Sequence, residues 1–368
     1  MSPPRILMTA DAVGGVWTYA LDLAAGLAEA GVRTILVTLG PSPSADQRAA
    51  AAAIPDIELV DTGLPLDWAA AEPAEIEDAA AALRGLARGV GADLVHLNSP
   101  ALAVAGCDAP VVGACHSCLA SWWAAVKDGP MPEDFRWRTR ALWRGLLACD
   151  ALVAPSHAFA RTTADLYEIP APFVVHNGRA TGGDPPAGDR ELTAFTAGRL
   201  WDEGKNASVL DAAAGLCGVP VRAAGPLEGP AGGHLAAHNL QALGRLPASQ
   251  VQAQMRASLI YASSALYEPF GLGVLEAAQA GCALVLSDIP TFRELWDEVA
   301  VFADPADAAA FAGAFDALAA DPARAKAMGA AARERAGAFT AQAMTAGVLE
   351  IYSHLGLTVA TPRREQAA

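Results

Sequence analysis

Short apolar runs alternate with longer helix-like stretches along the first half of the chain. Strands that are buried on both faces of a sheet read as such runs, with little in-out alternation. The runs predict strands at Arg5–Ala10, Arg33–Leu39, Ile57–Val60, Asp93–Asn98, Pro110–Cys115, Ala151–Ser156 and Phe173–His176. The stretches between them predict helices near residues 15–30, 72–89, 134–149 and 157–168. This alternation predicts an α/β fold with an open, doubly wound parallel sheet.

The pattern stops at Asn177–Gly188, which is rich in glycine and proline, and then begins again. The second half predicts strands at Leu192–Ala197, Val219–Ala224, Leu240–Leu243, Leu259–Ser263, Ala283–Ser287 and Val299–Ala303. Helices are predicted near residues 204–216, 249–257, 271–281, 307–320 and 322–336. A last amphipathic helix is expected near 340–355, and Leu357–Ala368 is expected to be a frayed tail. We therefore predict two doubly wound domains that join near residue 180.

Composition and charge narrow the function classes. At roughly 150 residues per domain, 368 residues agree with two domains. A hydrophobic share of 53% excludes intrinsic disorder, and a net charge of −15 argues against a general nucleic-acid binder. No apolar run approaches the ~20 residues that a membrane-spanning helix needs, and the start lacks the apolar core of a signal peptide. A cytoplasmic protein is the expectation.

Two local patterns favour ordinary structure over chemistry. Cys115 and Cys118 have CxxC spacing, but none of the other four cysteines forms a second such pair, so buried thiols are favoured over a zinc or redox site. Residues 136–144 combine arginines with tryptophans on a predicted helix. Peripheral membrane contact is one interpretation, but the acidity of the chain favours an ordinary amphipathic helix.

The most informative stretch is 267–277, YEPFGLGVLEA, which leaves a strand and enters a helix. Gly271 and Gly273 allow a ligand to approach the backbone closely, and the free amides of the first helical turn form an anion site. Glu276 lies about one turn inside the helix, where it can meet the diol of a ribose. Glu268 precedes the helix, where it can face a sugar attached to a phosphate. The pattern indicates a binding site for a sugar nucleotide.

Two further glycine-containing loops follow predicted strands. In 197–206, AGRLWDEGKN, Arg199 can grip phosphate oxygens through two N–H groups and Lys205 supplies a point charge. In 11–16, DAVGGV, a glycine turn follows the first strand. That turn lacks the GxGxxG motif and the acidic residue that bind a nicotinamide dinucleotide. Contact of this turn with a phosphate or an acceptor is therefore favoured over dinucleotide binding.

In this order the three stretches resemble the glycosyltransferase family 4 group of retaining enzymes with the GT-B fold. The resemblance extends over Gly14-Gly15, Ala154-Pro155-Ser156 and His176-Asn177-Gly178. It implies two Rossmann-like domains that face a cleft: an acceptor-side domain over 1–180 and a nucleotide-sugar domain over 181–338. Residues 339–368 are then a helix that crosses back to the first domain, plus a tail.

The resemblance also implies roles for individual residues. Arg199 and Lys205 hold the donor diphosphate, Glu276 binds the ribose, and Glu268 addresses the transferred sugar. His116, at the end of a strand, falls where the family places a histidine close to that sugar. The donor set is completed by Gly15, Phe270, Gly271, Leu272 and Gly273. The expected acceptor side comprises Gly14, Asn98 and Trp122.

The chain departs from the family pattern around the base pocket. Residues 223–226, AAGP, stand where an acidic residue is common, and His176 replaces the usual proline before Asn177-Gly178. The stretch 227–239 is short and rich in glycine. These changes concern the base pocket and not the diphosphate site.

The function implied is hexosyl transfer from a nucleoside-diphosphate sugar with retention of configuration. Because the chain has no Asp-x-Asp motif, we expect no metal and no cofactor, with the sugar nucleotide as co-substrate. The acceptor is a sugar, a lipid-linked molecule or another small molecule, and no nucleic acid is expected. The alternatives are a sugar-nucleotide 2-epimerase with the same architecture, and an inactive sugar-nucleotide-binding protein.

Overall fold

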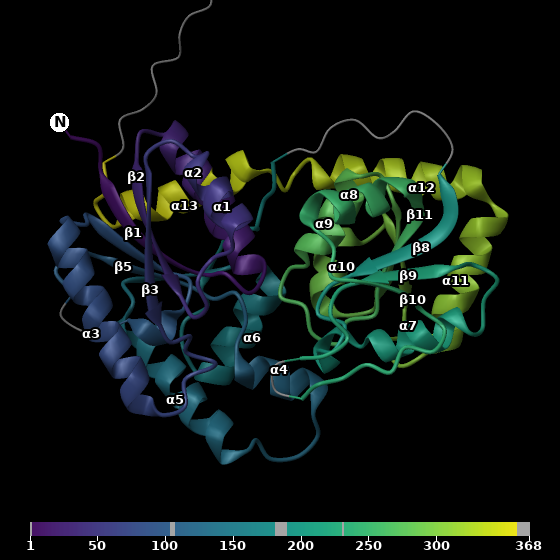
Figure 1. The fold of residues 1–368 in the computed structure, drawn as a ribbon, viewed down its shortest axis with the longest axis horizontal. Coiled ribbons are helices and arrows are strands. Elements are labelled where there is room, and N and C mark those ends of the chain that lie inside the picture. The colour runs from purple at the N-terminus through teal and green to yellow at the C-terminus, as the bar shows by residue number, and fades with distance from the viewer. Residues whose placement is uncertain (1, 104–106, 181–189, 230–231, 359–368) are drawn as a thin grey trace, which may run out of the picture. The chain divides into compact units, whose positions relative to one another are not determined.

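The computed structural model describes residues 2–103, 107–180, 190–229 and 232–358, and the chain divides into two compact units. Unit 1 comprises Met1–Trp123, Gly129–Ala180 and Ala341–Ala368, and unit 2 comprises Ala124–Asp128 and Thr181–Thr340. Figure 1 shows their helices and strands. Most of the glycine- and proline-rich stretch (181–188) and most of the expected tail (359–368) lie outside the described residues.

Unit 1 contains a parallel sheet of the predicted doubly wound kind. Its order is β3 (Ile57–Leu64), β2 (Arg33–Leu39), β1 (Arg5–Asp11), β4 (Leu94–Leu97), β5 (Val111–Ala114), β6 (Ala151–Ala154) and β7 (Phe173–Val174). Successive residues of β1, Ile6, Leu7 and Met8, are all fully buried, as helices on both faces require. The strand order reverses between β1 and β4, and the carboxyl ends of the strands at such a point are where ligands bind in this fold class.

The helices of this part of the chain include two that the apolar pattern did not predict. The predicted ones are α1 (Gly15–Glu29), α3 (Pro73–Val90), α5 (Glu133–Ala148) and α6 (His157–Tyr167). The additional ones are α2 (Ala45–Ala52) and α4 (Leu119–Val126). Helix α2 is mostly alanine and buries only Ala51, whereas α4 is apolar almost throughout, so neither shows a helical period of apolar residues.

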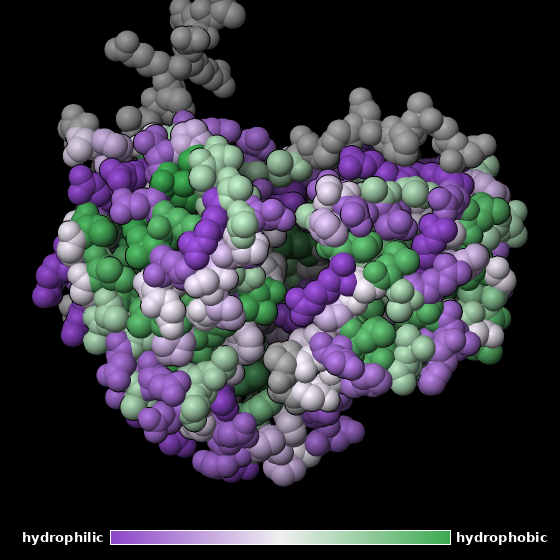
Figure 2. All heavy atoms as spheres, viewed as in Figure 1, coloured by the Kyte–Doolittle hydropathy of each residue, from purple (hydrophilic) through white to green (hydrophobic). Residues whose placement is uncertain are grey.

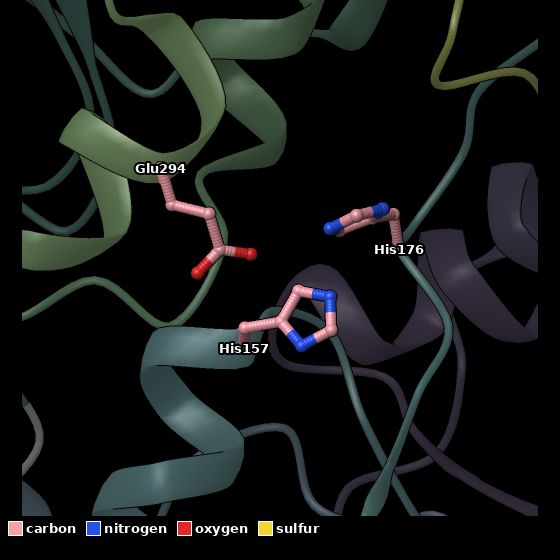
Figure 3. A group of neighbouring side chains, drawn as sticks. All are labelled: His157, His176 and Glu294. Atoms are coloured by element: carbon pink, nitrogen blue, oxygen red, sulfur yellow. The ribbon is translucent and has the colours of Figure 1, made fainter.

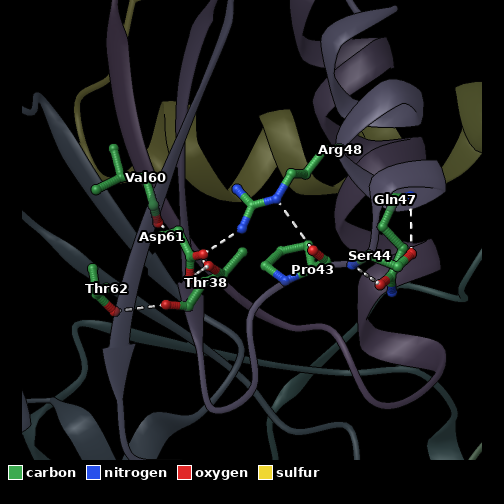
Figure 4. Close-up of polar contacts among 8 residues, drawn as sticks. All are labelled: Thr38, Pro43, Ser44, Gln47, Arg48, Val60, Asp61 and Thr62. Atoms are coloured by element: carbon green, nitrogen blue, oxygen red, sulfur yellow. Dashed lines mark hydrogen bonds and ion pairs between the residues drawn. The ribbon is translucent and has the colours of Figure 1, made fainter.

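Polar contacts at the outer strands position α2 (Figure 4). Ser44 and Gln47 form a reciprocal capping box at its start, and the Gln47 side chain also donates to the carbonyl of Ala12, 2.9 Å away. Arg48 pairs with Asp61 of β3 at 2.5 Å, and Thr38 of β2 donates to the other Asp61 oxygen. These bonds connect the loop after β1 to α2, and α2 to the edge of the sheet.

The last helix, α13 (Ala341–His354), belongs to unit 1, in agreement with the expected return of the chain. Its Met344, Val348 and Tyr352 are buried against α1 and the sheet. The Tyr352 hydroxyl lies 2.8 Å from Nδ1 of the buried His96 on β4. Helix α1 approaches α13 so closely that a Cβ atom on Gly26 would lie 2.1 Å from Oγ1 of Thr345.

Unit 2 contains the second parallel sheet. Its order is β10 (Gln241–Gly244), β9 (Val221–Ala224), β8 (Glu191–Ala197), β11 (Ser258–Ser263), β12 (Ala283–Ser287) and β13 (Ala300–Ala303). Its helices are α7 (Ala207–Ala214), α8 (Ala248–Ala257), α9 (Leu272–Gln279), α10 (Pro290–Trp296), α11 (Ala308–Ala320) and α12 (Pro322–Ala336). The apolar core of this unit consists of two clusters of buried side chains. One contains Phe311 and Phe315, and the other contains Phe292 and Trp296.

The expectation of one continuous helix over 204–216 is wrong. A short 3₁₀ helix covers Glu203–Lys205, Asn206 adopts a left-handed conformation with φ 53°, and α7 begins only at Ala207. The helix α10 was also not predicted, because its seven residues are too few to show a period.

The surface mixes residue types on the face drawn in Figure 2, where hydrophilic and hydrophobic residues are interspersed over both units. Isolated exposed apolar side chains include Trp68, Phe173 and Leu216. Within the described ranges, no helix combines the length and the hydrophobicity that crossing a membrane would require.

The contact between α1 and α13 predicts opposite effects for two glycine substitutions. Gly26→Ala should lower stability by about 1–3 kcal/mol, because the new methyl group would overlap Thr345. Gly85→Ala, at a position of α3 with open space around it, should raise stability by up to about 1 kcal/mol through helix propensity. Urea denaturation followed by circular dichroism measures both. Equal midpoints for the two variants would show that α13 does not pack tightly on α1.

Candidate functional site

The loop after β8 carries Arg199 and is held by Asp202. Arg199 donates to one oxygen of Asp202 at 3.0 Å, and the other Asp202 oxygen accepts from the Gly204 amide at 2.9 Å. The guanidinium group also lies 6.0 Å from the centre of the Trp201 ring, and 49% of the Arg199 side chain is exposed. Arg199 is therefore oriented by its neighbours while its charge stays accessible. The sequence analysis missed Asp202, although its position three residues after Arg199 is a signal for such a pair.

The loop after β11 is joined to this first loop by several hydrogen bonds. The carbonyl of Gly204 accepts from the amides of Leu266 and Tyr267 at 2.9 and 3.2 Å. Asn206 donates to the carbonyls of Ser264 and Pro305 at 3.0 and 2.7 Å. The Ser264 hydroxyl in turn donates to the Asn206 carbonyl at 2.8 Å. The carboxyl ends of β8 and β11 therefore form one connected surface on unit 2.

Two of the predicted residues meet on this surface. Lys205 forms an ion pair with Glu268, and both side chains are largely buried. A partly buried charge is costly unless it has a partner, and each of these two groups supplies the partner of the other. An anionic ligand at Lys205 would therefore compete with a carboxylate that is already in place.

The start of α9 lies close to β11. Gly271 precedes the helix with φ 93°, a left-handed conformation that favours glycine, and a Cβ atom on Gly273 would lie 2.7 Å from the Tyr261 hydroxyl. Burial raises the pKa of Tyr261, and the charges of Glu276 and Glu268 raise it further. Glu276 lies on α9, whose first residue is Leu272, and Glu268 lies three residues before Gly271.

Phe270 differs from the expectation for a donor-binding residue. Its side chain is only 3% exposed and packs against Phe339, with 5.8 Å between ring centres, inside the apolar core of unit 2. Burial of the ring among core residues leaves only the backbone of Phe270 for contact with a ligand. The expected contact of Phe270 with the donor therefore stays a prediction that concerns its backbone.

The region that departs from the family pattern packs against the Arg199 loop. Gly225 has φ 141°, and a Cβ atom there would lie 1.8 Å from the Gly198 carbonyl oxygen. The Trp201 ring occupies the space beside Gly229 and Gly233. Small residues are required at these positions because the two loops approach each other at backbone distance.

In unit 1, His116 and Asn98 lie together at the carboxyl ends of the neighbouring strands β5 and β4. Nε2 of His116 is 2.8 Å from Oδ1 of Asn98. The Asn98 side chain donates to the Thr9 carbonyl at 2.6 Å, and its backbone amide donates to the Thr9 hydroxyl at 2.9 Å. The Tyr19 ring packs edge-on against the imidazole, with 4.4 Å between ring centres. Asn98 therefore fixes the orientation of His116.

A second histidine, His96, lies under this site and was not predicted. It is fully buried, and burial lowers its pKa to about 4. Burial also lowers the pKa of His116 to about 3, and the nearby His96 adds to the effect. Both imidazoles are therefore neutral near pH 7, where each can accept or donate one hydrogen bond per nitrogen.

The remaining residues of the expected acceptor side lie at the same edge or on α4. One oxygen of Asp11 accepts from the amides of Val13 and Gly14, which shapes the turn before Gly15 and α1. Trp122 lies on α4, with its ring 6.5 Å from that of Phe135 on α5.

An additional acid lies near Asp11. Burial raises the pKa of Asp67, a hydrogen bond from Ser99 opposes the shift, and the charge of Asp11 adds to it. The sequence analysis missed Asp67 because a single Asp in an irregular segment carries no pattern.

Two family models match the chain, one over each half. The family model described as Glycosyltransferase Family 4 matches residues 13–181, and that described as Glycosyl transferases group 1 matches residues 197–335. No curated protein sequence matches the chain.

Several solved structures share the fold. Sucrose-phosphate synthase from Thermosynechococcus elongatus has a TM-score of 0.76 at 16% identity, over 96% of this chain and 99% of that one. Anabaena HepE in complex with UDP and glucose has a TM-score of 0.73 at 16% identity, over 95% and 100%. Staphylococcus aureus TarM, as a mutant with Fondaparinux, alpha-GlcNAc-glycerol and UDP, has a TM-score of 0.74 at 10% identity, over 95% and 99%. At these identities the likeness concerns the fold.

The two neutral histidines predict a loss of stability in acid. Because their pKa values are lower in the folded chain than the ~6.5 of an unfolded histidine, the unfolded state binds protons more strongly. The free energy of unfolding should therefore be greatest above about pH 6.5 and fall toward pH 4, by up to about 1.4 kcal/mol per pH unit for each histidine.

Denaturation at a series of pH values tests this expectation. His96→Gln should reduce the slope between pH 6.5 and 4, whereas the exposed His354→Gln should leave it unchanged. A wild-type slope in the His96 variant would contradict the assignment of a buried neutral imidazole.

Proposed function

The chain belongs to the family 4 glycosyltransferases with the GT-B architecture, and we propose that it transfers a hexose from a nucleoside-diphosphate sugar with retention of configuration. The acceptor in this proposal is a hydroxyl group of a sugar, a lipid-linked molecule or another small molecule. The diphosphate is bound without a metal ion.

The observation that carries the proposal is the ion pair between Lys205 and Glu268. It joins the loops that follow β8 and β11, the neighbouring strands at which the order of the unit 2 sheet reverses. A cation and a carboxylate at this point match a ligand that carries a diphosphate next to a sugar. Lys205 binds the phosphate oxygens, and Glu268 then turns to the hydroxyl groups of the sugar.

Stabilisation of the leaving group comes from fixed positive charge. As the bond between the anomeric carbon and the phosphate oxygen breaks, negative charge develops on the nucleoside diphosphate. In this proposal Arg199 and the first amides of α9 stabilise that charge, and Lys205 joins them once Glu268 has turned to the sugar. Glu276 binds the ribose hydroxyls.

The acceptor attacks from the face that the diphosphate leaves. The acceptor oxygen bonds to the anomeric carbon, the departing phosphate oxygen takes the acceptor proton, and configuration is retained because both events occur on one face. Glu268 stabilises the positive charge that develops on the sugar. For unit 1, we assign His116 to a sugar hydroxyl: near pH 7 it is neutral and held by Asn98.

A donor panel tests the proposed reaction. Since HepE and TarM were solved with UDP, UDP-sugars come first, followed by other nucleotides. Proton NMR of the product with a simple sugar acceptor should show the donor's anomeric configuration. Without acceptor the donor sugar should remain unchanged apart from slow hydrolysis. A donor converted to its 2-epimer would instead identify the epimerase.

The first prediction for this site concerns the diphosphate. Arg199→Ala and Lys205→Ala should each lower kcat/KM by an amount equivalent to about 2–4 kcal/mol, because each removes a charge that stabilises the leaving group. Arg324→Ala, an exposed position on α12, is the matched control. Rates with and without a chelator should agree. Near-wild-type rates in both site variants, or loss of activity with the chelator, would contradict a diphosphate site made of side chains.

The second prediction separates the two glutamates. Glu276→Gln should weaken the binding of both nucleoside diphosphate and donor, because a hydrogen bond to a charged group contributes about 1.5–3 kcal/mol. Glu268→Gln should leave nucleoside diphosphate affinity unchanged or higher, since Lys205 loses its competing partner, while kcat collapses. Calorimetry and kinetics on both variants make the comparison. The reverse pattern of affinities would mean that the donor binds the other way round.

A further inference from the structure

Two histidines of unit 1 lie side by side outside the residues assigned to the transfer reaction. His157 is the first residue of α6, and His176 follows β7 by two residues (Figure 3). Their rings are 6.0 Å apart between centres and inclined by 77°. Figure 3 also draws Glu294, which belongs to unit 2.

The sheet explains why these two side chains are neighbours. Strands β6 and β7 pair in parallel, with Ala154 opposite Val174, and the Val175 amide continues the ladder by donating to the Ala154 carbonyl at 3.0 Å. Because the two strands are parallel, their carboxyl ends lie at the same edge of the sheet. His157 comes three residues after the end of β6, so both imidazoles emerge at adjacent strand ends.

The backbone on either side of the pair is fixed. Ser156 is fully buried, and its hydroxyl caps α6 by accepting from the Phe159 amide at 3.1 Å. On the other segment, Arg179 forms an ion pair with Asp22 of α1. The backbone carbonyl of Arg179 accepts a hydrogen bond from the Ala341 amide at 3.0 Å, so the segment after His176 is bound to the start of α13. A ligand shared by the two rings would therefore have to order only the side chains.

The geometry points to a binding site for a borderline divalent transition-metal ion, of which Zn²⁺ is the representative, held by His157 and His176. One ring nitrogen of His157 and one ring nitrogen of His176 lie within 4.8 Å of each other. Two zinc–nitrogen bonds of ~2.05 Å at a tetrahedral angle place the nitrogens about 3.3 Å apart, so small side-chain rotations suffice. His157 is exposed, which allows such a rotation and leaves room for water to complete the coordination.

The donor set selects the kind of ion. Imidazole nitrogens suit Zn²⁺, Ni²⁺ and Cu²⁺, whereas Mg²⁺, Ca²⁺ and Mn²⁺ prefer oxygen ligands. Because protons compete with the metal for the same nitrogens, binding weakens as the pH is lowered. Neither histidine is among the residues assigned to the donor or the acceptor in the proposed transfer reaction.

Calorimetric titration of the full chain with ZnCl₂ near pH 7.5 tests the site. We expect one saturable site per chain, and a loss of affinity of about tenfold or more in His157→Gln and in His176→Gln, because a chelate needs both ligands. The affinity of the double variant for Zn²⁺ should be only slightly lower than that of either single variant. His354→Gln, an exposed histidine of α13, is the matched control and should bind as wild type, and MgCl₂ should not bind.

A second measurement needs no variant. Diethyl pyrocarbonate modifies accessible imidazoles, and peptide mass spectrometry locates the modified residues. Zn²⁺ should protect His157 and His176 together and leave His354 reactive. The proposal would be overturned if either single variant bound Zn²⁺ with wild-type affinity, which is the result expected for binding to cysteines. It would also be overturned if Zn²⁺ protected one of the two histidines without the other.

Discussion

The candidate donor site depends on the junction between the loops after β8 and β11, and Asn206 is at its centre. Asn206 interrupts the helix that would otherwise run from Gly204 into α7, and its side chain donates to the carbonyls of Ser264 and Pro305. Asn206 adopts a left-handed conformation directly after Lys205, which pairs with Glu268. The junction thus holds the cations of one loop and the carboxylate of the other on one connected surface.

The second consequence of this arrangement is that the site contains its own counterion. A cation held in a partly buried position needs a partner, and Glu268 supplies it. In the proposed reaction, a diphosphate would take the place of Glu268 at Lys205 and free the carboxylate for the attached sugar. Under that proposal one ion pair would couple binding of the leaving group to orientation of the sugar, within a protein whose net charge is −15.

Unit 1 places its candidate residues through the core. His116 is oriented by Asn98, Asn98 is held by Thr9, and His96 on the same strand end is held by Tyr352 of the last helix. Tyr352 and His96 are 256 positions apart in the chain. The return of α13 therefore completes the polar interior of unit 1, and the close approach at Gly26 shows how tightly that helix packs.

The strands of both sheets were largely predictable from the sequence, because central strands that are covered on two faces are mostly apolar, and the glycines and charged residues at the strand ends could be located as well. The helices α2, α4 and α10 were not predicted, because segments that are rich in alanine, wholly apolar or very short show no helical period of apolar and polar residues. Only the tertiary structure paired Lys205 with Glu268, placed the Phe270 ring in the core, and brought His157 to His176. Each of these depends on partners distant in sequence, whose meeting is decided by strand order and packing rather than by any local pattern.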